Sequence, residues 1–307
     1  MTRLTESLTR QVTPWLDILG IPVADLGYTQ ALDFIEARIE RRDYTPVAFL
    51  NANNANIAIE DPEFARTLDR FLILSDGVGV DMAAKILHGR MFKANLNGTD
   101  FIPALLAHCG QSLKVGLIGA RREVAEAACA KFTFDNPRHE FRVISDGYFK
   151  AGDEDAIRQR TADFAPDIVL VAMGVPRQEQ FANRVLIAGT CTVPITVGAL
   201  FDLHTGIIPR APEWMRSTRT EWVFRLWKEP KRLWRRYVMG NPLFLLRVIK
   251  CRFTGKSRDG GEPLMAIVSI KSQQVTFYDA DGWILKAPVS TGTKGRDLAG
   301  EATRLLT

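Results

Sequence analysis

Short apolar runs rich in Val, Ile and Leu alternate with longer amphipathic stretches between about residues 45 and 198. As strands, these runs would be apolar on both faces, which is typical of strands that helices cover on both sides. The predicted strands are 47–50, 71–74, 115–118, 141–144, 168–172 and 195–197, and the predicted helices are 61–70, 80–88, 101–109, 122–132, 155–164 and 177–188. The alternation predicts an α/β fold with an open, mostly parallel, Rossmann-like sheet and helices on both of its faces.

A different pattern begins at residue 210, where helical stretches follow one another without strands. Pro230 and Pro242 each suit a first helical position, with Asn241 as the cap of the second helix. Both helices carry apolar and aromatic side chains on one side and basic side chains on others. Such a segment is typical of proteins that lie on an anionic membrane surface or fold over an anionic ligand. The alternative is a solvated charged face over a small core.

Beyond a Gly- and Ser-containing linker near 256–261, strand-like runs return at 266–270, 275–278 and 283–287. Asp281-Gly282 suits a hairpin turn between the second and third of these runs. We therefore divide the chain into an α/β body (1–209), a basic amphipathic helical appendage (210–256), and a linker with a short β-rich tail (257–307).

Charge is distributed unevenly over these parts. The chain of 307 residues has a net charge of +5, yet residues 1–209 hold 21 basic and 26 acidic side chains. Residues 210–256 hold 13 Lys and Arg against three Glu, together with four of the six Trp. An anionic partner is therefore expected to meet the chain in the appendage.

The four Cys form no C-x-x-C pair, and we expect free thiols in a reducing compartment. The first 20 residues contain no apolar core of a secretory signal, and the longest apolar runs are far shorter than a membrane span. These features predict a cytoplasmic protein, or one that is peripheral on the inner face of the cytoplasmic membrane.

Polar residues follow the end of each predicted strand, where open α/β sheets bind their ligands. Asp76, Asp146 and Asp202 all have this placement, and a carboxylate there can act as a general base toward a sugar hydroxyl. Asp76 can equally be a turn residue that caps the next helix, and spacing alone does not choose among the three. Neither a G-x-G-x-x-G fingerprint nor a Walker motif occurs in the sequence.

Two further groups of residues have alternative interpretations. Arg177, Gln178 and Glu179 open a helix after Gly174 and can hold a sugar or phosphate, or they can form an ordinary charged first turn. His204 is interpreted as a surface residue rather than a base, and the His and Cys residues show no metal-ligand spacing.

An ordered series of motifs resembles the WecG/TagA/CpsF family of bacterial glycosyltransferases. The series comprises Asn51-Ala-Asn53, Ser75-Asp76-Gly77-Val-Gly79, Asn97-Gly98-Thr99-Asp100, Gly174-Val-Pro-Arg-Gln178-Glu179, Val197-Gly198-Ala-Leu-Phe-Asp202, Arg210-Ala-Pro212-Glu-Trp214, Glu221-Trp222, Arg225-Leu226, Glu229-Pro230 and Arg235-Arg236-Tyr237. The resemblance spans roughly residues 15–253, and it is specific because the motifs fall in the order and spacing of the family.

The resemblance implies an inverting enzyme that moves a sugar from a UDP-sugar to a polyprenyl-diphosphate-linked saccharide in bacterial surface or exopolysaccharide biosynthesis. The sugar would be N-acetylmannosamine-like, its uronate, or glucose. By its place in the motif, Asp76 is the implied catalytic base, and Asn51 and Asn53 would line the sugar pocket. Several family members have Thr where this chain has Asn51. No metal or other cofactor is expected.

The resemblance also assigns substrate binding to residues of the later motifs and to Arg side chains of the appendage, which would neutralise the two diphosphates. These residues are Gly77, Gly98, Asp100, Gly174, Gln178, Glu179, Gly198, Asp202, Arg210, Arg219, Glu221, Arg225, Arg232, Arg235 and Arg236. The chemistry is consistent, because negative charge develops on the departing UDP and a forked guanidinium suits a diphosphate.

The tail has a resemblance of its own. Residues 264–297 are similar to the first strands of an L,D-transpeptidase domain, whose chemistry needs a downstream Cys and His. Cys251 and His204 are the last Cys and His of the chain, so we expect this part to be catalytically inactive.

Two other functions compete with the glycosyltransferase. A non-enzymatic protein could bind anionic lipid or nucleic acid through the Arg- and Trp-rich segment, but it would leave the polar loops of the body unexplained. A nucleotide-cofactor oxidoreductase is disfavoured by the missing glycine fingerprint. We expect no nucleic-acid partner, and the sequence leaves a monomer and a homo-oligomer open.

Overall fold

A computed structural model describes residues 7–212, 215, 221–255, 265–269, 274–279 and 282–288 of the chain. The chain divides into two compact units, Met1–Ser257 and Arg258–Thr307. The larger unit therefore contains both the α/β body and the basic appendage. All four Cys lie within it as free thiols.

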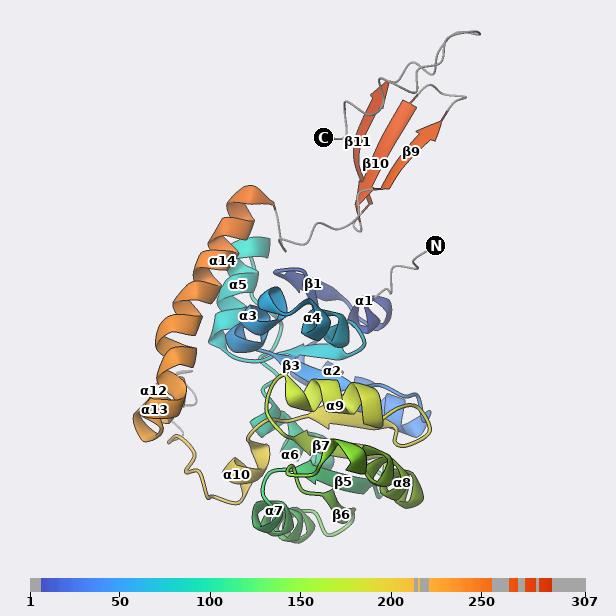
Figure 1. Cartoon of the computed structure of the whole chain (residues 1–307), viewed down its shortest axis with the longest axis vertical. Coiled ribbons are helices and arrows are strands. Elements are labelled where there is room, and N and C mark those ends of the chain that lie inside the picture. The colour runs from blue at the N-terminus through green and yellow to red at the C-terminus, as the bar shows by residue number, and fades with distance from the viewer. Residues whose placement is uncertain are drawn as a thin grey trace. The chain divides into compact units, whose positions relative to one another are not determined.

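The larger unit is built around a parallel sheet with strand order β4-β3-β8-β7-β5-β6 (Figure 1). Its strands are β3 (Val47–Leu50), β4 (Leu72–Ser75), β5 (Lys114–Gly119), β6 (Glu140–Ser145), β7 (Ile168–Ala172) and β8 (Val193–Thr196). The predicted strands are confirmed, with ends shifted by no more than two residues. β6 differs in burial, because it is an outer strand and leaves Glu140 and Arg142 exposed.

Helices cover both faces of this sheet, because successive side chains of a buried strand point to opposite sides. Ala48 and Leu50 pack into one core, and Val47 and Phe49 into the other. The first core is covered by α3 (Ala52–Glu60), α4 (Pro62–Leu68), α5 (Val78–His88), α8 (Glu154–Phe164) and α9 (Arg177–Val185), and the second by α2 (Tyr28–Glu40), α6 (Gly98–His108), α7 (Arg122–Asp135) and α10 (Leu200–His204). A short 3₁₀ helix, η1 (Ala151–Asp153), precedes α8.

The segment before residue 45 protects one edge of the sheet. It forms α1 (Leu8–Val12), a hairpin of β1 (Trp15–Ile18) and β2 (Ile21–Ala24), and α2, none of which was predicted. Thr9 of α1 donates its hydroxyl to the Phe71 carbonyl at 3.0 Å and accepts the Ile73 N–H at 2.9 Å. These bonds occupy backbone groups that the outer strand β4 would otherwise leave unpaired.

The basic appendage forms α12 (Glu221–Lys228), α13 (Pro230–Trp234), a π-helical turn η2 (Arg235–Met239) and α14 (Gly240–Thr254). The prediction of a helix start at Asn241-Pro242 was wrong, because the helix continues through that point from Pro230. Pro242 has no N–H to donate within the helix, and the Gly240 N–H bonds the Arg235 carbonyl five residues back. The π-turn thus accommodates the proline without ending the helix.

The smaller unit contains a three-stranded antiparallel sheet in the order β11-β10-β9. Its strands are β9 (Met265–Ser269), β10 (Gln274–Asp279) and β11 (Gly282–Pro288), which confirms the three predicted runs. The predicted turn residue Asp281 lies outside the described residues.

Candidate functional site at the carboxyl edge of the sheet

The topology brings several predicted site residues to one edge of the sheet. All six strands are parallel, so the loops that follow them leave from the same edge. β4, β3, β8 and β7 are neighbours, and the loops that follow them begin with Asp76, Asn51, Val197-Gly198 and Met173-Gly174. Asp146 instead follows β6, the outer strand on the other side. The topology thus separates Asp146 from Asp76, which spacing had left equivalent.

Asn51 connects the start of α3 to Asp76. Its Oδ1 accepts the N–H groups of Asn53 and Asn54, both at 3.1 Å, and so caps the helix. This capping bond fixes which way the amide points, and its Nδ2 donates to Asp76 Oδ2 at 3.3 Å. One side chain therefore starts α3 and orients the proposed base. Asn53 lies half-buried in the first turn of that helix.

Asp76 is held by its backbone as well as by Asn51. Its N–H donates to the Leu50 carbonyl at 2.8 Å, which extends the β3–β4 pairing by one residue. Gly77 then turns the chain into α5 with φ of +93°, a conformation that favours glycine. The Gly77 N–H donates to Asn95 Oδ1 at 3.3 Å. As a residue, Asp76 is half-buried at this turn, at the edge where ligands of such sheets bind.

The start of α6 brings a second carboxylate and an arginine of the appendage together. Asn97 caps α6 by accepting the Asp100 N–H at 3.1 Å, and its Nδ2 donates to Asp100 Oδ2 at 3.0 Å. Arg210 forms an ion pair with Asp100 through Nη2 and Oδ1. Gly98 begins the helix against the Phe49 ring. Asp100 and Arg210 thus pair with each other, although they lie 110 residues apart in the chain.

Gln178 and Glu179, which are predicted to bind substrate, are both buried. They lie in the first turn of α9, after Gly174, but their residues are only 3% and 1% exposed. Gln178 Oε1 accepts the Gly198 N–H at 3.1 Å, which ties the loop after β8 to α9. Both side chains point into the protein because α9 packs against β7 and β8. Asp202 is half-buried in α10, where its carbonyl accepts the Ile208 N–H at 3.1 Å.

His204 has a structural role that the sequence did not predict. Its ring stacks on Phe132 with centroids 3.9 Å apart, and its Nε2 lies 3.3 Å from Asp135 Oδ2. The side chain is 13% exposed, so the predicted surface residue is half-buried. Burial lowers the pKa of this imidazole.

Helix α14 anchors the appendage beside Asn51 and Asp76. It packs on α3 and α5, the two helices that begin directly after these residues. Phe244 and Val248 are fully buried, and Arg247 donates to Asn56 Oδ1 at 2.8 Å and pairs with Glu60 at 2.7 Å. The sequence did not single out Arg247 as a functional residue. The sequence does contain a signal for the partial burial of Arg247. This residue lies between Phe244 and Val248, two apolar residues four positions apart that form the buried side of the helix.

The other predicted residues of the appendage are placed only in part. Glu221 is half-buried at the start of α12. Arg235 is exposed and Arg236 half-buried in η2, where they lie over the rings of Trp234 and Tyr237. Arg225 and Arg232 lie in α12 and α13, but their side chains are outside the described residues, as is the whole of Arg219.

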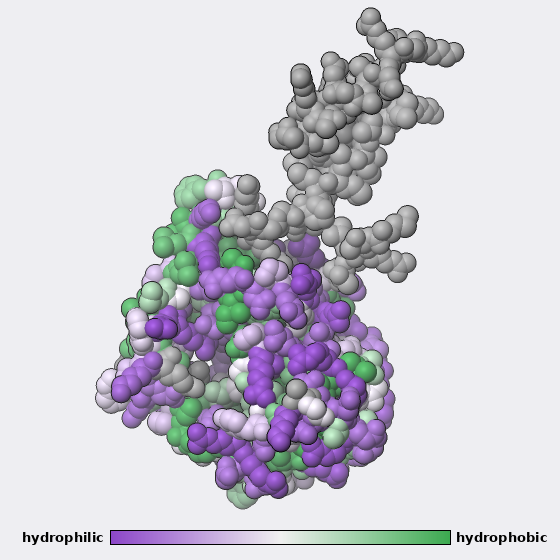
Figure 2. All heavy atoms as spheres, viewed as in Figure 1, coloured by the Kyte–Doolittle hydropathy of each residue, from purple (hydrophilic) through white to green (hydrophobic). Residues whose placement is uncertain are grey.

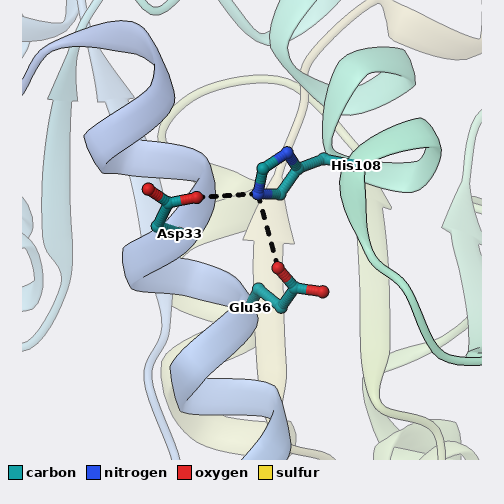
Figure 3. Close-up of side chains that lie close together, drawn as sticks. All are labelled: Asp33, Glu36 and His108. Atoms are coloured by element: carbon teal, nitrogen blue, oxygen red, sulfur yellow. Dashed lines mark hydrogen bonds and ion pairs between the residues drawn. The ribbon is translucent and has the colours of Figure 1, made fainter.

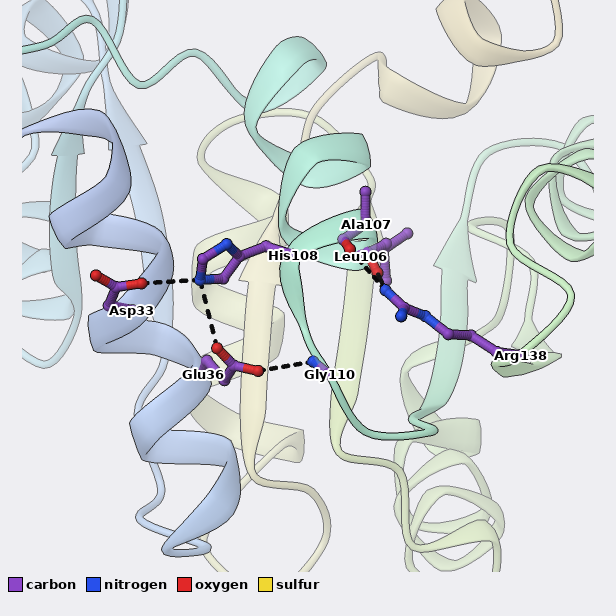
Figure 4. A network of polar contacts seen from close by, with 7 residues as sticks. All are labelled: Asp33, Glu36, Leu106, Ala107, His108, Gly110 and Arg138. Atoms are coloured by element: carbon purple, nitrogen blue, oxygen red, sulfur yellow. Dashed lines mark hydrogen bonds and ion pairs between the residues drawn. The ribbon is translucent and has the colours of Figure 1, made fainter.

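One group within the described residues has metal-ligand chemistry, and it lies away from this edge. Asp33, Glu36 and His108 bring their ligand atoms within 4.8 Å of one another (Figure 3). His108 ends α6, about 16 Å from the start of that helix at the carboxyl edge. Its Nε2 lies 2.8 Å from Asp33 and 3.3 Å from Glu36, and Glu36 also accepts the Gly110 N–H (Figure 4). The three side chains satisfy one another and brace α2 against α6.

The fold and the arrangement at the carboxyl edge place the chain in the class of Rossmann-like α/β enzymes. The profile of the family described as "Glycosyl transferase WecG/TagA/CpsF family" matches residues 16–258. The chain belongs to this family and is a glycosyltransferase. The match ends at residue 258, so the resemblance of the tail to L,D-transpeptidases has no support from it.

Two relatives carry the same name, N-acetylglucosaminyldiphosphoundecaprenol N-acetyl-beta-D-mannosaminyltransferase. The protein of Bacillus subtilis (strain 168) is 30% identical over 236 residues, which cover 76% of this chain and 90% of the relative. The protein of Bacillus spizizenii is 32% identical over 213 residues, which cover 68% and 81%. Among the described residues, no helix combines the length and the apolar character needed to cross a bilayer.

Proposed function

We propose that this glycosyltransferase moves an N-acetylmannosamine-like sugar from a UDP-sugar to a polyprenyl-diphosphate-linked saccharide, with inversion at the anomeric carbon. The observation that carries the proposal is the packing of α14 on α3 and α5, the helices that follow Asn51 and Asp76, which ties the basic appendage to this part of the body. The names of the two relatives support this acceptor and sugar. The product would be an intermediate of a bacterial surface or exopolysaccharide.

In the proposed reaction Asp76 removes the proton from a hydroxyl of the acceptor saccharide. The hydroxyl oxygen then bonds to the anomeric carbon, while the bond from that carbon to the UDP oxygen breaks and UDP leaves with the electron pair. The amide of Asn51 holds Asp76 in the position of a base. Arg side chains of the appendage supply positive charge to the departing diphosphate, so no metal is needed in this scheme.

The appendage also carries features of a surface that lies on a membrane. Beside its buried stripe, α14 exposes Leu246 and Phe253, which are 63% and 84% exposed. Figure 2 shows hydrophobic residues along the side of the molecule where Figure 1 places α14. Lys250 and Arg252 are exposed on the same helix. We propose that this helix contacts the anionic inner face of the membrane, where a lipid-linked acceptor would be located.

The test is turnover by the purified chain with a short polyprenyl-diphosphate-linked N-acetylglucosamine as acceptor. UDP-N-acetylmannosamine, its uronate and UDP-glucose are compared as donors, with and without a chelator. UDP release and the mass of the glycolipid are measured, and reactions without acceptor serve as controls. We expect transfer from an N-acetylmannosamine-like donor at the same rate in the chelator. Failure with every one of these donors would contradict the proposed donor and acceptor.

A further inference from the structure

Glu179 is a buried carboxyl group for which the proposed reaction has no direct use. Its residue is 1% exposed, and it lies one position after Gln178 at the start of α9. Oε1 accepts the Gln178 Nε2–H at 2.7 Å. Because a buried ionised carboxylate is costly unless several donors or a cation compensate it, the protonation state of this group needs an explanation.

The second oxygen of this carboxyl group has no hydrogen-bond donor among the described residues to compensate a negative charge. Within the part of the chain that the structure describes, neither Glu179 Oε2 nor Thr196 Oγ1 has a hydrogen-bond partner. Thr196 is the last residue of β8 and is 1% exposed. Its side chain is close enough to lower the pKa of the Glu179 carboxyl. With no donor to Oε2 from the described part of the chain, burial favours the neutral, protonated carboxyl group over the carboxylate.

Gln178 transmits the position of Glu179 to the candidate site. Its Nε2 donates to Glu179, and its Oε1 accepts the N–H of Gly198 at 3.1 Å. Gly198 lies in the loop that follows β8, between the loops of β3 and β7 at the carboxyl edge. A displaced Gln178 would release the backbone of this loop.

We infer that Glu179 is a positioning residue that works in its protonated form, holding Gln178 and through it the Gly198 loop in the shape that binds the donor sugar nucleotide. This inference rests on the proposed function for the identity of the donor. The buried carboxyl, the oriented amide and the loop N–H form one chain of hydrogen bonds from the interior to the site.

The electrostatic surroundings agree with this assignment. Burial raises the pKa of Glu179 to about 7, although Gln178, the backbone of Glu179 and Thr196 each lower it. β7 and β8 carry no charged side chain. On α8, Glu154 pairs with Arg184 and Arg158 binds the carbonyls of Arg184 and Val185, at the far end of α9. The charged residues of α4, Glu63 and Arg66, are exposed. Arg70, which follows α4, donates to Asn183. On α9 itself, Arg177 lies over the ring of Phe149.

The decisive comparison is between Glu179→Gln and Glu179→Ala. Glutamine keeps an acceptor for the Gln178 amide and stays neutral at every pH. We expect wild-type kcat/KM for the donor to fall as the pH rises through about 7, and this loss to be absent in Glu179→Gln. Glu179→Ala is expected to raise the donor KM about tenfold at every pH, with a smaller change in kcat. An unchanged alkaline loss in Glu179→Gln would overturn the inference.

Two measurements test the inference without an activity assay. They therefore distinguish a failure of the inference from a failure of the proposed function. Infrared spectra of wild type should contain the C=O band of a protonated carboxylic acid that disappears above about pH 7 and is absent in Glu179→Gln. Amide hydrogen exchange at residues 198–202 should accelerate in Glu179→Ala and stay slow in Glu179→Gln. A spectrum without such a titrating band, or equal exchange in all three proteins, contradicts the inference.

Discussion

Asn51 serves two partners at once, and the two can be separated by substitution. Its Oδ1 caps α3, and its Nδ2 donates to Asp76. Asn51→Asp keeps a cap oxygen but places a second carboxylate beside Asp76. We expect it to retain wild-type thermal stability and to lose about 100-fold or more in kcat, because the base loses its donor and gains a like charge.

The matched variant is Asn51→Ala, which loses both partners. It is expected to lose about 1 kcal/mol of unfolding free energy as well as activity. Thermal unfolding and UDP-release kinetics of the two variants are the measurements. Wild-type kcat in Asn51→Asp would show that the contact with Asp76 is not used in the reaction.

Because of the raised pKa of Glu179, we predict that the stability of the folded protein falls as the pH rises. Its pKa is about 7 in the folded protein against an ordinary value of 4.5, so between these values the folded state holds a proton that the unfolded state has lost. Its contribution to stability is therefore full below about pH 4.5 and is lost as the pH rises through about 7. The unfolding free energy lost over this pH range is about 3 kcal/mol. Denaturant unfolding of wild type and Glu179→Gln should diverge in this direction, and parallel curves would refute it.

At the scale of elements, local patterns predicted the strands but not the parts that need distant partners. The buried runs that became β3 to β8 were visible because each strand is apolar by itself. The sequence predicts no helix over α3, because its Asn-rich start favours caps and turns over helix interiors. The burial of Glu179 was missed because a charged first turn usually faces solvent. Arg247 was not singled out because it meets Asn56 across 191 residues.

The exposed stripe of α14 predicts membrane binding that can be removed without unfolding the protein. Leu246→Glu with Phe253→Glu changes only exposed positions, so the fold should persist. We expect this double variant to lose binding to vesicles that contain anionic lipid. Phe134→Glu on α7 is the matched control, since Phe134 is 85% exposed on another helix and should leave binding intact. Equal flotation of all three proteins with the vesicles would contradict the proposed surface.

At the scale of the whole molecule, the uneven charge divides the larger unit of the chain into the same two parts as its fold. The acidic body supplies the sheet edge with Asp76, and the basic segment is held against it by α14. The net charge of +5 alone would suggest a nucleic-acid partner. The family and the position of the basic helices instead favour diphosphates of a sugar nucleotide and a lipid carrier.

The most direct test of the account is the Asp76→Asn variant, assayed for both turnover and UDP binding. The substitution preserves size and removes the proton acceptor. The account predicts a loss of at least about 1000-fold in kcat, with UDP affinity within about threefold of wild type. Wild-type turnover by Asp76→Asn would contradict it.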